Sequence, residues 1–276
     1  MTDRYAVIGN PIAHSKSPLI HSRFAELTGQ DISYTRIEAP LDGFAATLRE
    51  FAQSGGRGVN VTAPFKLQAF DAATECSARA RRAGAVNAIA CLPDGRLLAD
   101  NFDGLGLRAD LERNLGVTLA GRRVLLLGAG GAARGALEPL CDARPATLVV
   151  ANRTADKAQA LATEAAAFAE NTVVGCGLDA LGGQVFDVII NATSASQGDA
   201  LPSIAASVFG RGCIAYDMVY GRGLTPFLRM AREAGVERLA DGAGMLVEQA
   251  AEAFAWWRGV RPATRAVIDE IAVPLV

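Results

Sequence analysis

The sequence predicts an α/β protein of two domains, of which the second is a Rossmann-type, doubly wound parallel sheet. The chain of 276 residues is longer than a single hydrophobic core usually needs. Short β-branched or Leu-rich runs alternate with Ala-rich stretches of helical length. The stretch "RRVLLLGAGGAARG" reads as a strand, a glycine-rich turn and the start of a helix. We therefore expect two sheets with an active-site cleft between them.

Strand-like runs recur along the whole chain. They cover residues 5–10, 33–39, 58–64, 122–128, 147–153, 185–192, 213–220 and 236–242. Helix formers lie between many of them, as in "ADKAQALATEAAAFA" at residues 155–169. This alternation favours mainly parallel sheets. The domain boundary is expected near residues 100–116, where a loop leads into a helix.

Composition excludes several classes of protein. Half of the residues are hydrophobic and 20% are charged, which is typical of a folded globular chain. Its 27 basic and 29 acidic residues leave a net charge of -2 without a long run of either sign. A nucleic-acid partner is therefore not expected.

Cysteines and the N-terminus indicate the compartment. The five cysteines are widely spaced, lack a C-x-x-C pair, and are expected to be buried apolar residues in a reducing environment. The start "MTDRYAVIGNP" does not resemble a signal peptide, and no apolar stretch reaches the roughly 18 residues of a membrane span. We expect a cytoplasmic protein that does not bind membranes.

The glycine-rich turn predicts a dinucleotide site. Gly128 would permit the tight turn, Gly130 would let a pyrophosphate approach the backbone, and the small Ala133 would let helix pack on strand. The N–H groups and the positive dipole end of the following helix would face the phosphates. A glycine-rich turn can also be only a turn, but the flanking strand and helix favour the cofactor site.

The end of the next strand indicates which dinucleotide binds. An NAD site usually places Asp or Glu there, whereas "TLVVANRTADK" has Asn152, Arg153 and Thr154, with Lys157 one turn later. A guanidinium, a hydroxyl and an ammonium suit a 2'-phosphate, which predicts NADP. The alternative is a helix start with Thr154 as N-cap and solvated basic residues. Arg153 at the discriminating position favours the phosphate.

A candidate proton-transfer lysine lies in the first domain. In "GVNVTAPFK", strand alternation sends two valines to one face and Asn60 and Thr62 to the other. Pro64 ends the strand and suits the first turn of a helix, which places Lys66 at the positive end of the helix dipole. That setting suits proton transfer near neutral pH. Taken alone, a solvated surface lysine is the commoner case.

Further polar residues cluster in the same half of the chain. Ser15 and Ser17 lie in a proline-bounded loop, and Asn87 interrupts the apolar run "GAVNAIA". A buried asparagine must be hydrogen-bonded, either by protein or by ligand. Each of these residues alone is typical of a local turn or a satisfied amide, so it is their joint occurrence that favours a site.

Ten motifs in order resemble the shikimate dehydrogenase family. They are "GNPIAHSKSP", "NVTAPFK", "GAVN", "DGLGL", "GAGGAARG", "NRT", "NATS", "YDMVYG", "TPF" and "DGAGMLVEQAAEAF". The resemblance implies an NADP-dependent oxidoreductase that interconverts 3-dehydroshikimate and shikimate in aromatic amino-acid biosynthesis. It also implies a substrate domain formed by residues 1–104 plus 245–276 and an NADP-binding domain formed by residues 105–244.

The resemblance also assigns roles to residues. It places Ser15 and Ser17 on the substrate carboxylate, with Tyr220 nearby, and Asn60, Thr62, Asn87 and Gln249 on the ring hydroxyls. Lys66 and Asp103 form the catalytic pair, and no metal is required. For the cofactor, the resemblance implies a phosphate loop formed by Gly128, Ala129, Gly130, Gly131 and Ala132. It implies a 2'-phosphate site formed by Asn152, Arg153 and Thr154. It places Met218, Gly242 and Met245 beside the nicotinamide.

Two departures from the family pattern leave alternatives open. Phe102 stands where the family usually has threonine, in "DNFDG", and Lys157 stands where arginine is common. The first puts substrate fit and turnover in question and could mark a specialised relative; the second could soften the NADP preference. A quinate/shikimate dehydrogenase is the close enzymatic alternative. A non-catalytic metabolite-binding protein is the other, although the intact catalytic pair argues against it. We expect a monomer or a homodimer.

Overall fold

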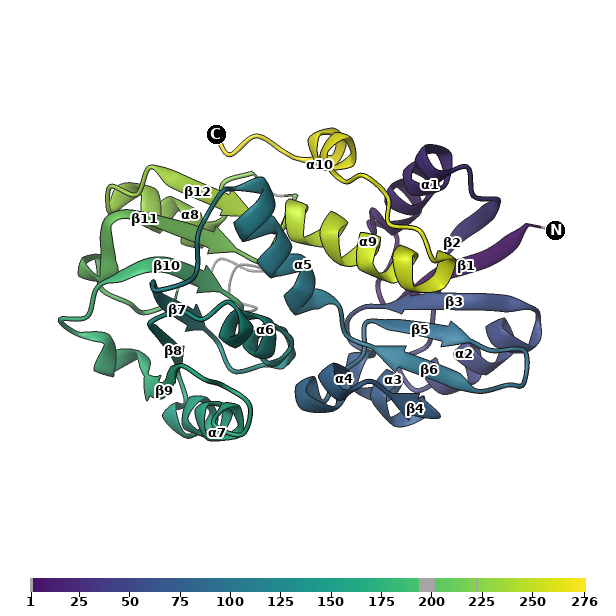
Figure 1. Ribbon diagram of the computed structural model, residues 1–276, viewed down its shortest axis with the longest axis horizontal. Helices are drawn as coiled ribbons and strands as arrows, with labels where there is room; N and C mark the ends of the chain where they lie inside the picture. The colour runs from purple at the N-terminus through teal and green to yellow at the C-terminus, as the bar shows by residue number, and fades with distance from the viewer. Residues whose placement is uncertain (1, 194–201, 222) are drawn as a thin grey trace. The chain divides into compact units, whose positions relative to one another are not determined.

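The computed structural model describes residues 2–193, 202–221 and 223–276. Within it the chain forms two compact units, each built around one sheet (Figure 1). The first unit comprises Met1–Gly106 and Val247–Glu270, and the second Leu107–Leu246 and Ile271–Val276. The sequence had assigned residues 271–276 to the first domain, whereas they group with the second. Ser194, the last residue of the "NATS" motif, lies outside the described residues.

The first unit contains a six-stranded mixed sheet of order β2-β1-β3-β5-β6-β4. Its strands are β1 (Asp3–Gly9), β2 (Ile32–Glu38), β3 (Gly56–Val61), β4 (Glu75–Cys76), β5 (Ala88–Cys91) and β6 (Leu97–Asp100). β1 is parallel to β2 and β3, whereas β5 is antiparallel to both β3 and β6. The strands β4, β5 and β6 were not predicted, because runs of two to four residues carry too little periodicity.

Helices cover both faces of this sheet. The helices with residues in this unit are α1 (Ser17–Thr28), α2 (Phe44–Gln53), α3 (Lys66–Ala72), α4 (Ala78–Ala83), α5 (Asp103–Ala109), α9 (Ala243–Arg258) and α10 (Arg265–Ile271), of which α5, α9 and α10 also contribute residues to the second unit. Phe44 of α2 and Phe65 pack with Val59 and Val61 in one buried cluster. On the other face, Phe24 of α1 meets Phe254 of α9. The valines of β3 therefore point to the α2–α3 face, and Asn60 points to the opposite one, as the alternation predicts.

The second unit contains a six-stranded parallel sheet of order β12-β11-β10-β7-β8-β9. Its strands are β7 (Arg123–Leu127), β8 (Thr147–Asn152), β9 (Thr172–Gly177), β10 (Phe186–Asn191), β11 (Phe209–Asp217) and β12 (Arg238–Asp241). Taken in chain order this is the 3-2-1-4-5-6 arrangement of the doubly wound fold, so the order reverses between β7 and β10. The predicted fold class is confirmed.

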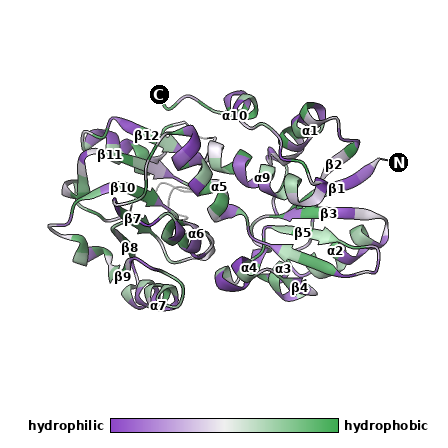
Figure 2. Ribbon diagram, viewed as in Figure 1, coloured by the Kyte–Doolittle hydropathy of each residue, from purple (hydrophilic) through white to green (hydrophobic). Residues whose placement is uncertain are grey.

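Alternating side chains of the central strands form two cores in this unit. Val124 and Leu126 pack with α6 (Gly131–Asp142) and α7 (Ala155–Ala165), whereas Leu125 and Leu127 pack with α8 (Pro226–Glu233). Figure 2 shows the resulting hydrophobic band along β7, β8 and β10. The helix predicted over residues 155–169 ends at Ala165. The described part of the chain contains no helix long and apolar enough to cross a membrane.

Candidate active site

The first unit brings Lys66 and Asp103 together. Lys66 Nζ lies 2.6 Å from Asp103 Oδ2, and each residue is the first of its helix, α3 or α5. The positive dipole end of a helix stabilises a carboxylate and destabilises an ammonium. The ion pair with Asp103 therefore offsets the unfavourable position of Lys66 at the start of α3. The side chain of Lys66 is 31% exposed, whereas that of Asp103 is 10% exposed. The ammonium is thus both held and accessible. Pro64 lies in the turn before α3 and not, as predicted, in its first turn.

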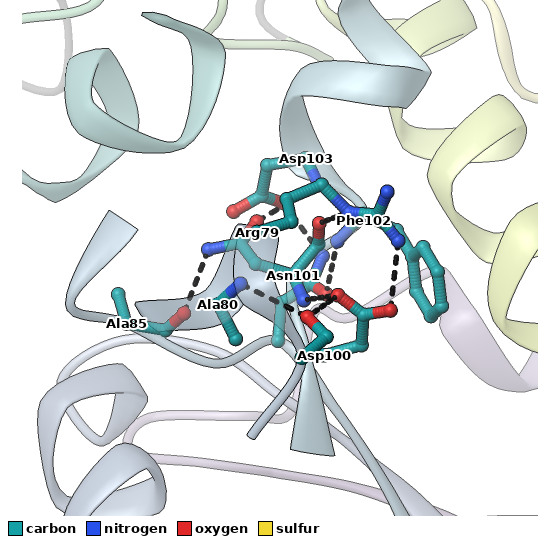
Figure 3. A network of polar contacts seen from close by, with 9 residues as sticks. Arg79, Ala80, Ala85, Asp100, Asn101, Phe102 and Asp103 are labelled. Atoms are coloured by element: carbon teal, nitrogen blue, oxygen red, sulfur yellow. Dashed lines mark hydrogen bonds and ion pairs between the residues drawn. The ribbon is translucent and has the colours of Figure 1, made fainter. Parts of the chain in front are cut away.

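Two asparagines hold Asp103 in place, one at its carboxylate and one at its backbone. Asn87 Nδ2 donates to Asp103 Oδ1 at 2.8 Å, which leaves Oδ2 for Lys66. The Asp103 backbone N–H donates to Asn101 Oδ1 at 3.0 Å, and Asn101 Nδ2 donates in turn to Ala85 O. Figure 3 shows Asn101 beside Asp103 in this network. Each carboxylate oxygen therefore has its own partner, which sets the direction in which Lys66 is held.

A partly buried ion pair braces the loop that carries Asp103. Arg79 donates to Asp100 Oδ2 at 2.7 Å and to Asn101 O at 2.8 Å (Figure 3). Ser77 donates to Asp100 Oδ1 at 2.5 Å. The loop between β6 and α5 is thus fixed by side chains as well as by its own backbone. The sequence offered no signal for Arg79, which looks like any solvated arginine of a short helix.

Phe102 has a packing environment of its own. The side chain is only 4% exposed and clusters with Ala88 and Ala253. The Trp256 ring meets it edge-on at 5.7 Å between centroids, and the Arg79 guanidinium lies 5.2 Å from its centroid. Its backbone N–H donates to Asn87 Oδ1. The ring that departs from the family pattern therefore belongs to the core, and its residue directly precedes Asp103 in the sequence.

The predicted ring-binding residues form one buried cluster. Asn60 Nδ2 donates to Asn87 O at 3.2 Å, and Asn87 Nδ2 contacts Gln249 Oε1 of α9 at 3.2 Å. These three side chains belong to residues that are 3–8% exposed. Thr62 follows the end of β3 and is partly exposed. The structure thus joins Asn60, Asn87 and Gln249 to the Lys66–Asp103 ion pair through Asp103.

The two predicted carboxylate-binding serines lie at the start of α1. Ser15 Oγ donates to Ser17 Oγ at 3.2 Å. Arg36 of β2 fixes the loop by donating twice to Ser15 O, at 2.6 and 3.1 Å. Tyr220 belongs to the second unit, where burial raises its pKa, so its approach to the serines stays a prediction.

Sequence reasoning missed two residues behind this cluster. His21 Nε2 lies 3.0 Å from Asn60 Oδ1, and Tyr34 donates to the same oxygen at 2.7 Å. Both residues are buried on apolar faces. A single histidine or tyrosine in such a pattern is typical of a core, so only the tertiary structure reveals their shared partner.

The glycine-rich turn of the second unit fits a pyrophosphate. Gly128 has a φ of +110°, and a Cβ at this position would lie 3.1 Å from Ala192 O. Ala192 directly follows β10, which is the strand next to β7 where the strand order reverses. A Cβ at Gly130 or Gly131 would meet no atom within 4 Å. The 12-residue α6 begins at Gly131, and the buried Ala133 packs against the sheet. Open space therefore adjoins the N-terminal N–H groups of α6, as a bound phosphate requires.

The turn after β8 carries the basic residues of the predicted 2'-phosphate site. Arg153, Thr154 and Lys157 are exposed, and Asn152 Nδ2 donates to Thr154 O at 3.0 Å. Thr154 is the N-cap of α7, but its side chain makes no capping hydrogen bond. The acid nearest in sequence, Asp156, lies in the first turn of α7 and is exposed. These groups fit a phosphate better than a pair of ribose hydroxyls.

The three residues expected at the nicotinamide lie close together. A Cβ at Gly242 would come within 2.3 Å of Met218 O, so only glycine allows this approach. Gly242 N–H donates to Val219 O, and Met218 packs against the buried cluster that contains Met245. The backbone after β11 and the start of α9 thus meet in the second unit.

Cysteines and metal ligands add little to the site. Cys91, Cys141 and Cys213 are buried, and burial raises the pKa of Cys141 to about 12. Cys76 and Cys176 are only partly buried, contrary to the prediction for all five. The described residues contain no group of three histidine, cysteine or acidic side chains that could hold a metal ion.

Comparison with protein families matches most of the chain. Residues 7–89 match the shikimate dehydrogenase substrate binding domain, and residues 110–199 match the shikimate / quinate 5-dehydrogenase family. Residues 242–271 match the shikimate 5'-dehydrogenase C-terminal domain.

Individual proteins agree with these matches. The chain is 55% identical to the shikimate dehydrogenase (NADP(+)) of Aromatoleum aromaticum, covering 96% of this chain and 95% of that one. It is 53% identical to the same enzyme of Dechloromonas aromatica over the full length of both. A crystal structure of an Ael1 enzyme from Pseudomonas putida matches with a TM-score of 0.94 and 55% identity, covering all of both chains.

A shikimate 5-dehydrogenase of Thermus thermophilus, in complex with NADP(H) and shikimate, matches with a TM-score of 0.85 and 33% identity, covering 97% of this chain and 98% of that one. The family models, the two curated relatives and the Thermus thermophilus structure all carry the name shikimate dehydrogenase, and together they cover both units of the chain. The chain belongs to the shikimate dehydrogenase family.

Proposed function

We propose that this protein is an NADP-dependent shikimate dehydrogenase that reversibly reduces 3-dehydroshikimate to shikimate. The observation that carries the proposal is the Lys66–Asp103 pair, 2.6 Å apart and joined to a cluster of buried amides. The names of the relatives support the substrate and the cofactor. The Thermus thermophilus relative was crystallised with both.

The substrate is held at both ends by residues of the first unit. Ser15 and Ser17 bind the carboxylate, far from the reacting carbon. Asn60, Thr62, Asn87 and Gln249 bind the ring hydroxyls. Most of these side chains already have protein partners that fix their direction, so little freedom is lost when the ring binds.

Lys66 supplies the proton in the reductive direction. Bound NADPH supplies the hydride. As the carbonyl carbon gains that hydride, the π electrons move to oxygen, and Lys66 Nζ donates a proton to form the new O–H bond. The resulting amine regains a proton from solvent. In the oxidative direction Lys66 removes the alcohol proton. Asp103 holds the ammonium toward the ring at the observed 2.6 Å.

Residues of the second unit hold the cofactor. The Gly128–Ala132 turn and the first turn of α6 accept the pyrophosphate, and Asn152, Arg153, Thr154 and Lys157 bind the 2'-phosphate. Met218, Gly242 and Met245 line the nicotinamide. The open space at Gly130 and Gly131 supports this assignment. No metal takes part.

One assay distinguishes the proposal from its alternatives. Purified protein is given shikimate or quinate with NADP+ or NAD+, and reduced cofactor is followed by absorbance. Efficient turnover of shikimate with NADP+ alone is expected. Comparable turnover of quinate would identify a quinate/shikimate dehydrogenase, which the description of one matching family also names. Binding of NADP+ and shikimate without turnover would identify a metabolite-binding protein.

A second experiment tests the place in metabolism. The gene is expected to restore growth without aromatic amino acids to a bacterial strain that lacks its own shikimate dehydrogenase. Turnover in the assay without such rescue would indicate a specialised relative, the alternative that Phe102 raises. A Lys66→Met variant that fails to rescue provides the control.

A further inference from the structure

His21 and Tyr34 form a buried stacked pair behind the substrate residues. Their rings lie 4.2 Å apart between centroids with an interplanar angle of 6°. His21 lies in α1 and Tyr34 in β2, and His21 is also packed against Phe24, Phe254 and Trp257. Both side chains carry a polar group into an otherwise apolar region, which is costly unless each group is hydrogen-bonded.

Both polar groups converge on one oxygen. His21 Nε2 lies 3.0 Å from Asn60 Oδ1, and the Tyr34 hydroxyl lies 2.7 Å from it. The other end of the amide faces Asn87 O at 3.2 Å. Because a carbonyl can only accept, the atom facing it must be Nδ2, and the atom facing the rings must be the acceptor Oδ1. The orientation of the Asn60 amide is therefore determined by its surroundings.

This arrangement also determines the protonation of the two rings. His21 Nε2 must carry its hydrogen, and Nδ1, which has no partner among the described residues, carries the lone pair. Burial lowers the pKa of His21 to about 3, so the ring stays neutral. Burial raises the pKa of Tyr34 well above its usual range, so its hydroxyl stays a donor.

The Asn60 amide leads on to further residues of the site. Tyr34 donates to Asn60 Oδ1, and Asn60 Nδ2 donates to Asn87 O. The side chain of Asn87 in turn contacts Asp103 and Gln249. A continuous chain of hydrogen bonds thus runs from Tyr34 through Asn60 and connects the two rings with the residues assigned to the ring hydroxyls.

We propose that His21 and Tyr34 are positioning residues for substrate recognition. Together their donor groups occupy Asn60 Oδ1, so the Asn60 amide can offer a ligand only an N–H group. The site then selects a ligand hydroxyl whose oxygen accepts a hydrogen bond from that N–H. The two contacts also fix the direction in which this N–H donor points. The inference rests on the proposed function, which places Asn60 on the substrate.

A double-mutant cycle tests this role. Tyr34→Phe removes one oxygen and keeps the ring stack, and we expect it to raise the KM for shikimate about three- to tenfold with a smaller change in kcat. In an Asn60→Ala background the same change should have no further effect. An equal loss in both backgrounds would overturn the inference. His21→Leu should act like Tyr34→Phe, and His21→Gln, which keeps an N–H at similar reach, should restore most of the affinity.

A spectroscopic measurement separates this inference from the proposed function. The side-chain amide signals of Asn60 in 15N-labelled protein are identified by their absence in Asn60→Ala. They should be sharp and slow to exchange with solvent in the unmodified protein, and should broaden or exchange faster in Tyr34→Phe and His21→Leu. Unchanged signals in both variants would refute the positioning role. Absence of shikimate turnover in the unmodified protein would refute the proposed function and leave this measurement valid.

Discussion

Lys66 is the residue whose loss should cost the most chemistry. A positioned proton donor contributes about 100-fold or more, so Lys66→Ala should lower kcat by at least that factor while the KM for shikimate changes much less. Lys66→Met keeps the length of the side chain without its charge and should be comparably slow. Steady-state kinetics at saturating cofactor provide the measurement. Near-normal turnover of Lys66→Ala would show that the lysine only binds or lies on the surface.

Asp103→Asn should also be slow, but with a mixed effect. Its carboxylate contacts both Lys66 and Asn87, so its replacement disturbs the proton donor and a ring-binding amide together. We expect kcat to fall and KM to rise in the same variant. A fall in kcat alone would confine Asp103 to positioning the lysine.

Phe102 is expected to matter for stability more than for turnover. Its ring fills a pocket lined by Ala88, Ala253 and Trp256 under the Arg79 guanidinium. Truncating a buried phenylalanine costs about 3 kcal/mol or more, so Phe102→Thr should lower the thermal midpoint by several degrees. The departure from the family pattern puts substrate fit and turnover in question, but the burial of the ring gives it a packing role first. Higher kcat at an unchanged midpoint would contradict this account, and Phe102→Leu serves as the milder control.

His21 should make the protein sensitive to acid. Its pKa is about 3 in the folded chain against an ordinary value of 6.5, so the unfolded state binds the extra proton first. The stability it contributes is complete above about pH 6.5 and is lost as the pH falls toward 3, by up to about 1.4 kcal/mol per pH unit. Urea midpoints of the unmodified protein and His21→Gln should therefore converge between about pH 7 and about pH 4.5. Parallel profiles would show that His21 is protonated in the fold.

At the scale of elements, the turn between β8 and α7 decides cofactor choice. Arg153→Ala removes a charged contact worth about 1.5–3 kcal/mol, which corresponds to an increase of roughly ten- to a hundredfold in the KM for NADPH. The KM for the substrate should stay nearly constant. Unmodified protein that used NAD+ as efficiently as NADP+ would contradict the assignment, and Arg122→Ala on an exposed surface is the matched control.

Elements differ in how well local sequence predicts them. β7 and β8 were predicted because continuous apolar runs are typical of buried parallel strands. β9 was missed because its two glycines resemble a turn. A Cβ at Gly175 would lie 2.2 Å from Ala158 O, so glycine is present there to admit α7 and not to bend the chain. That requirement comes from a neighbouring element and leaves no local signal.

At the scale of the whole molecule, the substrate and cofactor residues divide between the two units. Apart from Tyr220, the residues assigned to shikimate belong to the first unit, and those assigned to NADP belong to the second. Shikimate alone should slow amide hydrogen exchange at the start of α1 and around α3. NADP+ alone should slow it at the start of α6 and in the turn after β8. Protection of both units by either ligand alone would contradict this division.

The sequence by itself determined the α/β class, the Rossmann order and the positions of the ten motifs, because periodicity and glycine spacing are local properties. It also indicated Lys66 and Arg153 as candidates through their places beside a strand end and a helix start. Through the family resemblance it also paired Lys66 with Asp103, whose side chains lie 2.6 Å apart. Only the tertiary structure decided that Phe102 is a core residue and that His21 and Tyr34 share Asn60 Oδ1. The physical reason is that the direction of a polar side chain depends on partners far away in the chain. The two donors to Asn60 come from residues 39 and 26 positions away, and nothing in the local pattern around any of the three records their meeting.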